Sequence, residues 1–463
     1  MNRWFTVISL ACIAGALLVR PLSTPGPLLR DFEAYWSAGS VWSAHVSPYG
    51  RALWRAEREI PAVNASRDEL LPFAGPPATL MVWSALARFD YATAAALWFG
   101  ILAAAGVALV AVVVFWSLRE PVSVWQLLPA LALAFAFGPV TSDIALGQVA
   151  LIAFLGATVT TAPLPLGIRS VAAFAALFQP NVAFGIVSQL GRNAATLALV
   201  IGALASYGIG AIFLGWRWPA SYAQFLLAHQ TAERLSAIQF TPAAIAHGAG
   251  VPGTAAGAIA VATALVAILA AVAISNRLAE PFARFAAVAP LAPFIAGFFH
   301  EHDFVVAYAA AGWCALRTRG LTRAIAFGAT LLVAIDWLGL AQRPTGVWQS
   351  ALLASAAACA FVALRNENDA RLTLVAAVGV AIVFVVCAGL AIGQPAPVWP
   401  DALGRFHAPA TASSSHVWLL EQARSGLLAV NPVWAFLREL PLAGCALLSL
   451  CVYLTARSEE LPA

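Results

Sequence analysis

Apolar residues gather in long runs along this chain, and short polar or proline-rich stretches separate the runs. Many of the runs approach the roughly 20 residues that an α-helix needs to cross the hydrocarbon core of a bilayer. The pattern predicts an all-α polytopic membrane protein with roughly 12–14 transmembrane helices. The expected spans cover residues 4–21, 73–88, 92–116, 125–140, 147–165, 169–190, 194–215, 254–275, 286–299, 303–316, 324–341, 346–364, 372–392 and 434–455.

Composition supports this interpretation. The chain of 463 residues is 62% hydrophobic and only 10% charged, whereas a soluble globular domain is about 25% charged. No soluble segment separates from the apolar runs, so residues 1–463 are expected to form a single integral membrane domain whose main partner is the lipid bilayer. The net charge of +4 is small and no basic block occurs, which argues against a nucleic-acid partner. The six cysteines lie inside apolar runs, where we expect them to pack rather than form disulfides, and no metal-binding spacing such as CxxC occurs.

Arginines in the short loops indicate the orientation, because cytoplasmic loops carry an excess of basic residues. With a cytoplasmic N-terminus, an uncleaved first span and alternating spans, most of these arginines fall on the cytoplasmic side. The same alternation makes three long loops and the turn FFHEHDF extracytoplasmic, and it places the turn before Gln148 in the cytoplasm. The long loops are residues 22–72, 216–253 and 393–433. We therefore expect a multi-pass protein of the cell membrane with an extracytoplasmic site.

The first long loop contains two segments, 31–44 and 49–59, that are expected to form short extracytoplasmic amphipathic helices at the membrane surface. Trp36, Trp42 and Tyr49 have the ring types that are enriched at the level of the lipid headgroups. A substrate free in solution would not require such a platform.

Asp31 and Glu33 stand two residues apart at the start of the first of these segments. Asp31 could be an N-cap, which accepts hydrogen bonds from free backbone N–H groups and suits the helix dipole. It could equally be a carboxylate at the membrane surface that acts as a general base. The pair could also bind a divalent cation, although two carboxylates alone make a weak site.

A second polar cluster, His300 to Phe304, lies between two apolar runs. Asp303 could simply cap the following helix, but this leaves two histidines and Glu301 without a purpose. Ionisable groups at membrane depth are costly and mark functional sites, and a histidine beside carboxylates can shuttle protons. His300, His302 and Asp303 could also hold a metal, which would require an extended backbone at this spacing.

Other polar residues give weaker signals. Gln179 precedes a proline within an apolar run, where proline frees backbone groups that polar neighbours can satisfy. Arg217, between two tryptophans, is either an interfacial anchor or a clamp for a phosphate group. His229 is expected to be a solvated surface residue, and Asp143 and Gln148 are expected to be turn and cap residues.

The order of these motifs resembles glycosyltransferase family 87. The segment DFEAYWSAGSVWSAHVSPYG is similar to the opening signature of that family, and further matches follow in the family's order over roughly residues 1–320. The matching positions of the opening are Asp31, Phe32, Tyr35, Trp36, Pro48 and Tyr49. The later similar segments are FAGPPATLMVWSAL, LGQVALIAFLG, FQPNVAFGIVSQL and FFHEHDFVVAY.

This resemblance implies a GT-C fold and transfer of a hexose, with mannose the first expectation, from a polyprenyl-phosphate-sugar donor. The acceptor would be a glycolipid or glycan on the outer face, and transfer would invert the anomeric carbon. The resemblance implies that Asp31 is the general base and that His300 or His302 assists it. Gln179 stands where the family usually has a lysine, which puts the donor in doubt. The residues expected to bind substrate are Glu33, Tyr35, Trp36, Tyr49, Gln179, Arg217, Glu301 and Asp303.

No cofactor is expected, and a divalent cation is left open. The competing interpretation is a polytopic transporter or a flippase for lipid-linked sugars. Such proteins typically show inverted repeats and interrupted helices that meet near the middle of the membrane. The sequence shows no such symmetry, and its acidic residues cluster in the expected outer loops.

Overall fold

The computed structural model describes residues 29–61, 71–120, 124–191, 193–334, 370–392 and 412–460, together with residues 354, 355, 357, 358 and 361. These residues form helices and turns, and none of them belongs to a strand. The expected span 4–21 and most of 346–364 lie outside the described residues, as does half of the third long loop.

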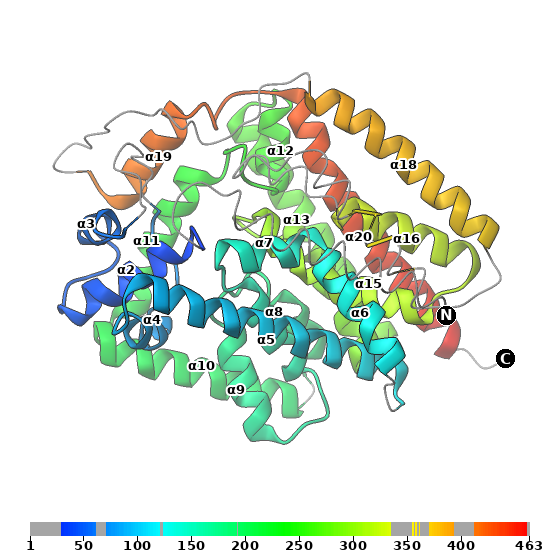
Figure 1. The fold of residues 1–463 in the computed structure, drawn as a ribbon, viewed down its shortest axis with the longest axis horizontal. Helices are drawn as coiled ribbons and strands as arrows, with labels where there is room; N and C mark the ends of the chain where they lie inside the picture. The colour runs from blue at the N-terminus through cyan, green and yellow to red at the C-terminus, as the bar shows by residue number, and fades with distance from the viewer. Residues whose placement is uncertain are drawn as a thin grey trace.

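The N-terminal half is built from helices of very different length (Figure 1). They are α2 (Phe32–Ser43), α3 (Ala52–Arg58), η1 (Pro77–Thr79), α4 (Leu80–Leu86), α5 (Tyr91–Leu118), α6 (Val124–Ala136), α7 (Gly138–Leu146), α8 (Ala150–Thr160), α9 (Leu166–Ala176), η2 (Phe184–Gln189) and α10 (Asn193–Leu214). The two helices expected in the first long loop are α2 and α3.

The C-terminal half continues in the same manner. Its helices are α11 (Trp218–Glu233), α12 (Pro242–Gly248), α13 (Gly253–Arg277), α14 (Pro281–Val288), η3 (Ala289–Phe294), η4 (Glu301–Ala307), α15 (Tyr308–Arg317), α16 (Gly320–Ala334), α18 (Ala370–Ile392), α19 (Ser414–Arg424) and α20 (Pro432–Glu460).

Four described helices are long and apolar enough to cross a membrane, namely α5, α10, α13 and α20. A fifth span results if α6 and α7, which are bent by 68° at their junction, count as one. The chain therefore fits a multi-pass helical membrane protein. Most other expected spans are shorter or broken helices in the described part of the chain. In η3, for example, Pro290 and Pro293 lack the N–H that a regular α-helix uses.

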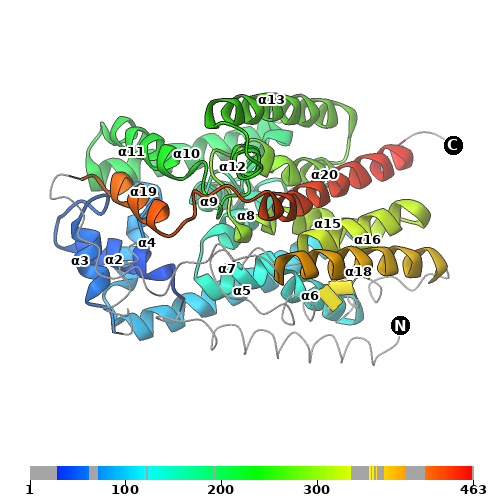
Figure 2. The same ribbon diagram turned by 90° about the horizontal axis from the view of Figure 1, so that it is seen from above.

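The molecule has two distinct ends. Both views place α2, α3, α4, α11 and α19 at one end, called here the Asp31 end, and the last turns of α20 at the other (Figures 1 and 2). Helix α5 connects the two ends. The hydroxyl of Tyr91, at its start, donates to the carbonyl of Leu29 over 3.2 Å. Arg119, after its last residue, forms an ion pair of 2.9 Å with Glu280, and we call this the Arg119 end.

The expected alternation of spans is wrong at residues 73–88. This run forms only η1 and the seven-residue α4, and α4 packs beside α2. Trp36 Nε1 donates to the carbonyl of Phe89 over 3.2 Å, so the chain is still at the Asp31 end when α5 begins. Helix α5 therefore takes Arg119 to the far end, and the turn before Gln148 comes back to Asp31 rather than lying opposite it.

The prediction of a single span is also wrong for residues 169–190. This second error cancels the first, so that the later loops lie at the ends of the molecule that the sequence predicted. The chain reaches the Asp31 end at Gln179, next to Pro180, and η2 then leads back to the Arg119 end. There the side chain of Gln189 donates to the carbonyl of Pro281 over 2.9 Å. This apolar run thus leads to the Asp31 end and back in two helices that are too short to be candidate spans. The loop 216–253 then lies at the Asp31 end as expected.

Glycines allow the backbones at the Asp31 end to approach closely. A Cβ on Gly39 of α2 would lie 2.2 Å from the carbonyl oxygen of Trp83 in α4. Gly147 has a φ of +78°, and a Cβ there would lie 2.8 Å from Leu29 Cβ and 2.9 Å from Phe32 Cβ. Because Gly147 immediately precedes Gln148, this close approach positions that side chain beside Asp31.

Gly147→Ala should lower the unfolding free energy by about 2 kcal/mol, because alanine adds left-handed backbone strain and a clash with Leu29. The measurement is thermal unfolding of the purified protein in detergent. Gly167→Ala is the matched control, since a Cβ there meets nothing within 4 Å. Equal unfolding midpoints for both variants and the parent protein would contradict this account of the turn.

Candidate functional site

Asp31 lies at the N-cap position of α2, but its side chain makes no capping hydrogen bond. Its Oδ2 instead accepts a hydrogen bond from Gln148 Nε2 at 2.7 Å, and its backbone N–H donates to the carbonyl of Leu146. The Oε1 of Gln148 accepts from the hydroxyl of Tyr35 at 2.6 Å. The carboxylate is therefore held by Gln148, which Tyr35 in turn positions, rather than used to cap its own helix.

Tyr35 is fixed by aromatic packing. Its ring stacks on Trp83 with the centroids 4.7 Å apart, and Trp83 Nε1 donates to Thr79 Oγ1. Burial, and then the carboxylate of Asp31, raise the pKa of the Tyr35 hydroxyl well above its ordinary value. The phenol therefore stays protonated and serves as a fixed hydrogen-bond donor to Gln148.

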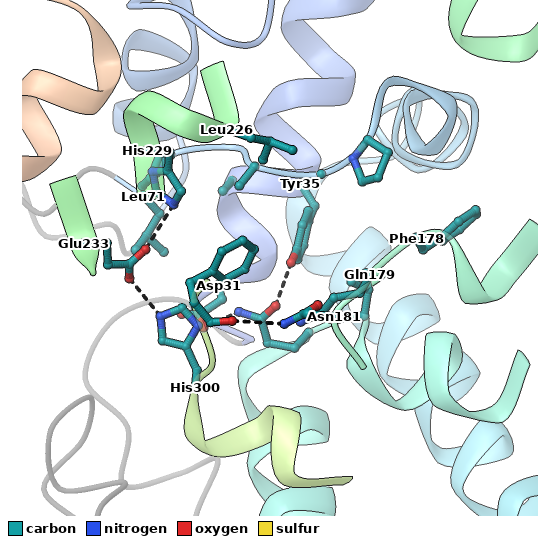
Figure 3. Close-up of a pocket in the computed structure, with 18 of the residues that line it drawn as sticks. Asp31, Tyr35, Leu71, Phe178, Gln179, Asn181, Leu226, His229, Glu233 and His300 are labelled. Carbon is teal, nitrogen blue, oxygen red and sulfur yellow. Dashed lines mark hydrogen bonds and ion pairs between the residues drawn. The ribbon is translucent and has the colours of Figure 1, made fainter. Parts of the chain in front are cut away.

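Asp31 and Tyr35 line a cavity of about 280 Å³ at this end of the molecule (Figure 3). Most of its wall is apolar or aromatic, contributed by segments that are far apart in the sequence. The lining residues that carry this character are Leu71, Pro72, Phe178, Tyr222, Leu226, Phe298 and Trp418. The polar lining residues include Asp31, Gln148, Gln179, Asn181, Glu233 and His300.

Arg30 is the arginine of this cavity. It is 4% exposed, and its Nε lies 3.8 Å from Asp31 Oδ1. The expected phosphate clamp, Arg217, is instead exposed at the start of α11 and does not line the cavity. The sequence carried a signal for Arg30, because it precedes Asp31 directly in LLRDFEAYW.

Glu233 is a second carboxylate of the cavity and lies between two histidines (Figure 3). Its Oε1 lies 2.8 Å from His300 Nε2 and its Oε2 lies 3.1 Å from His229 Nε2. Glu233 is 1% exposed and His229 is 5% exposed, so the expectation that His229 is a solvated residue is wrong. His229 is buried because its ring stacks between Phe225 and Trp418.

The charges of this pair follow from its geometry. Burial disfavours the charged form of His300, but the Glu233 carboxylate outweighs burial, and the pKa of His300 rises to about 9. Burial likewise opposes ionisation of Glu233, yet the two imidazoles together hold its pKa well below the ordinary value. At neutral pH the cavity therefore contains an imidazolium opposite the carboxylate of Asp31.

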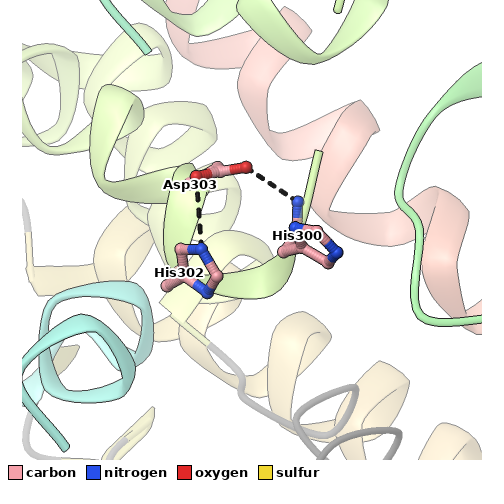
Figure 4. A group of neighbouring side chains, drawn as sticks. All are labelled: His300, His302 and Asp303. Atoms are coloured by element: carbon pink, nitrogen blue, oxygen red, sulfur yellow. Dashed lines mark hydrogen bonds and ion pairs between the residues drawn. The ribbon is translucent and has the colours of Figure 1, made fainter. Parts of the chain in front are cut away.

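Asp303 organises the turn below His300 (Figure 4). Its Oδ2 accepts from the backbone N–H of His300 at 2.9 Å and from Asn181 Nδ2 at 3.2 Å. Its Oδ1 accepts from Gln179 Nε2 at 2.5 Å and lies 3.4 Å from His302 Nε2. The capping role expected for Asp303 is present, and it also binds the segment of Gln179 to this turn.

His300, His302 and Asp303 also form a cluster that could in principle hold a metal ion. Their candidate ligand atoms lie within 4.8 Å of one another (Figure 4). Both oxygens of Asp303 already accept hydrogen bonds from the amides of Gln179 and Asn181. A metal here would have to displace those amides, so the donor set fits a hydrogen-bonded turn better than a metal centre.

The structure brings together five of the residues expected at the site. Asp31, Tyr35, Gln179, His300 and His302 all line the cavity. Asp303 supports it from behind, and so does Glu301, whose Oε1 accepts a hydrogen bond from Ser142 Oγ at 2.5 Å.

The other expected substrate-binding residues do not line it. The hydroxyl of Tyr49 donates to the carbonyl of Gly75, one layer behind the cavity. Trp36 packs against Tyr91. Glu33 lies near buried Glu57, and the pKa of Glu57 is raised by burial and then by the carboxylates of Glu33 and Glu421. Glu33 and Asp31 therefore do not act as a pair.

Sequence reasoning missed several residues of the site. Arg30, His229 and Glu233 were not expected to take part, and Gln148 was expected only to shape a turn. The signal for Gln148 was its position in LGQVALIAFLG, one of the segments that carry the family resemblance. Glu233 gave no local signal, because its partner His300 is 67 residues away along the chain.

No protein-family model matches the chain, and no curated protein or solved structure is significantly similar to it. The resemblance to glycosyltransferase family 87 therefore rests on the motifs quoted above.

Proposed function

We propose that this chain is a GT-C type glycosyltransferase that moves a hexose, with mannose the first choice, from a polyprenyl-phosphate donor to a glycolipid or glycan acceptor. One observation carries the proposal. The five segments that resemble family 87 lie far apart in the sequence, and each contributes a residue to the same cavity. These residues are Asp31, Pro76, Gln148, Gln179 and His300. Unrelated chance similarities would have no reason to converge in this way.

The chemistry of the cavity suits this reaction. Asp31 takes the proton of the acceptor hydroxyl as the hydroxyl oxygen attacks the anomeric carbon. The new C–O bond forms as the bond from that carbon to the phosphate oxygen breaks, and the electron pair leaves with the polyprenyl phosphate. Attack from the face opposite the leaving group inverts the anomeric carbon. Gln148 holds Oδ2 of the carboxylate, and we assign Oδ1, which lies 3.8 Å from Arg30 Nε, to the acceptor hydroxyl.

The charges around Asp31 favour a phosphate leaving group. Arg30 lies beside Asp31, and the imidazolium of His300 pairs with Glu233, so the cavity holds two cations and two carboxylates in a largely buried place where electrostatic interactions are strong. Both cations can engage a phosphate group that leaves beside Asp31. These cations take the role that a lysine would have had at Gln179. The apolar wall of the cavity provides a surface for the first prenyl units of the donor.

The arginines support an extracytoplasmic position for this cavity. With the path of the chain corrected, the arginines of the short loops gather at the Arg119 end, whereas Arg88 and the arginines of the long loops, such as Arg51 and Arg217, lie at the Asp31 end. Those at the Arg119 end are Arg119, Arg169, Arg277, Arg284, Arg317, Arg319 and Arg457. Cytoplasmic loops are enriched in basic residues, so the Arg119 end is proposed to be cytoplasmic and Asp31 to face outward.

Cysteine labelling tests this topology. Ser47→Cys at the Asp31 end should react with a membrane-impermeant maleimide in intact cells, and Ser458→Cys at the Arg119 end should react only after lysis. Both positions are exposed, and the parent protein gives the background from the native cysteines. Labelling of the Ser458 variant but not the Ser47 variant in intact cells would reverse the proposed orientation.

The bend of 68° between α6 and α7 favours one second candidate, a flippase for lipid-linked sugars. Reconstitution separates the two functions. The full chain in liposomes with a fluorescent polyprenyl-phosphate hexose and a crude glycolipid extract should release free polyprenyl phosphate and form a glycosylated lipid. Movement of intact donor between leaflets, with no cleavage, would favour the flippase and contradict the transferase.

A further inference from the structure

A second cavity lies at the Arg119 end of the molecule. Its volume is about 540 Å³, and it is lined by three arginines, Arg119, Arg169 and Arg284, and one carboxylate, Glu280. Two of the arginines are nearly buried, with 8% of Arg169 and 1% of Arg284 exposed. Arginine is the side chain best suited to bidentate recognition of phosphate, so the charge of this cavity favours an anion.

Hydrogen bonds hold the arginines in place. Arg169 Nε donates to the carbonyl of Thr160 over 2.9 Å, its only side-chain hydrogen bond to the described part of the chain. Arg284 donates to the carbonyl of Leu278 and to Gln189 Oε1, each over 3.2 Å. Carbonyl groups therefore orient Arg169 and Arg284, and the carboxylate of Glu280 orients Arg119.

Helix ends strengthen the preference for an anion. Helices α9, α10 and α14 begin at this cavity, and residues from the first turns of α10 and α14 line it. The N-terminus of a helix carries a partial positive charge and unpaired N–H groups, which bind phosphate and other anions. Helices α5 and α8 end here, and Arg119 and Arg169 lie at those negative ends.

The surroundings of the cavity indicate where the anion comes from. Leu164, Ile168 and Leu197 lie beside it on α9 and α10 and on the turn before α9, and all three are exposed. In a membrane protein such side chains face acyl chains. A phosphate bound at the three arginines would therefore be continuous with an apolar surface, as the headgroup and tails of a phospholipid are.

We propose that the cavity between Arg119, Arg169 and Arg284 binds the headgroup phosphate of an anionic phospholipid, at the membrane face opposite the Asp31 cavity. Glu280 limits the affinity, because its carboxylate lies in the same cavity and engages Arg119. The site is separate from the glycosyltransferase proposal, since no residue lines both cavities.

Native mass spectrometry of the full chain in neutral detergent tests this proposal. Phosphatidylglycerol should bind more tightly than phosphatidylcholine with the same acyl chains. Arg169→Gln should weaken the binding of phosphatidylglycerol at least about ten-fold, the effect of losing a charge-assisted hydrogen bond. Arg88→Gln, an exposed arginine at the Asp31 end, is the matched control and should change nothing.

Glu280→Gln should strengthen the binding of phosphatidylglycerol, because it removes the one carboxylate of the cavity and releases Arg119. Misfolding could not produce that gain, so this variant keeps the test informative if Arg169→Gln is unstable. Equal retention of the two lipids, or unchanged affinity in both cavity variants, would overturn the proposal. Competition by inorganic phosphate alone at millimolar concentration would assign the cavity to a soluble anion instead.

Discussion

Asp31→Asn should reduce sugar transfer by about 10²–10⁴-fold, the usual contribution of a general base. The asparagine keeps the size of the side chain and an oxygen for Gln148, so the fold and the cavity should persist. What it loses is the capacity to take the proton of the acceptor hydroxyl. The measurement is the rate of polyprenyl phosphate release by the reconstituted full chain, at equal protein and with thermal unfolding compared in parallel.

The matched control is Glu59→Gln in the same loop. Glu59 is exposed and does not line the cavity, so its conversion to an amide should leave the rate unchanged. Full activity in Asp31→Asn would remove Asp31 from the reaction, and an equal loss in Glu59→Gln would point to a general effect of charge in this loop.

Glu233→Gln should change the pH dependence of the reaction rather than only its rate. In the native protein the pKa of His300 is about 9, so the imidazolium is present at neutral pH and activity should fall as the pH rises through about 9. Without the Glu233 carboxylate, burial is the main remaining influence, and it should move this fall below the ordinary value of about 6.5. The variant should therefore be poorly active at pH 7.5 and recover towards pH 5.5.

The other charged groups near His300 affect its pKa less than Glu233 does. Asp303 and Asp31 also favour its protonation. His229 contacts the other oxygen of Glu233, and the ring of His302 stacks on that of His300 with the centroids 5.5 Å apart. The protonated His300 stabilises the fold fully below about pH 6.5, and this contribution is lost as the pH rises through about 9. A rate that is lower at every pH, with an unshifted profile, would show that Glu233 has only a structural role.

Hydropathy alone predicted the helical class, the four long helices and the two helices of the first loop. It failed where an apolar run does not form a single membrane-spanning helix. Residues 73–88 are long enough for a span, but they form a short helix that packs on α2. Residues 169–190 form two short helices that lead to the Asp31 end and back, with the reversal near Pro180. Run length gives the amount of apolar chain, whereas the path depends on tertiary packing.

The candidate site was predicted where local sequence carries the signal. Asp31, Tyr35 and His300 stand out because charged and aromatic residues cluster around them in a chain with few charges. Glu233 could not be found in this way, because it comes close to His300 only in the folded structure. Glu33 shows the reverse. It is close to Asp31 in the sequence, but in the helix its side chain lies near Glu57 instead of in the cavity with Asp31.

The most direct test of the central claim is mass spectrometry of the envelope glycolipids from cells that lack this chain, with the native protein or Asp31→Asn restored. The account predicts that a glycolipid one hexose lighter accumulates without the chain and also with Asp31→Asn. The native protein should restore the full glycolipid. Identical glycolipids in all three strains, or full restoration by Asp31→Asn, would contradict a transferase built on Asp31.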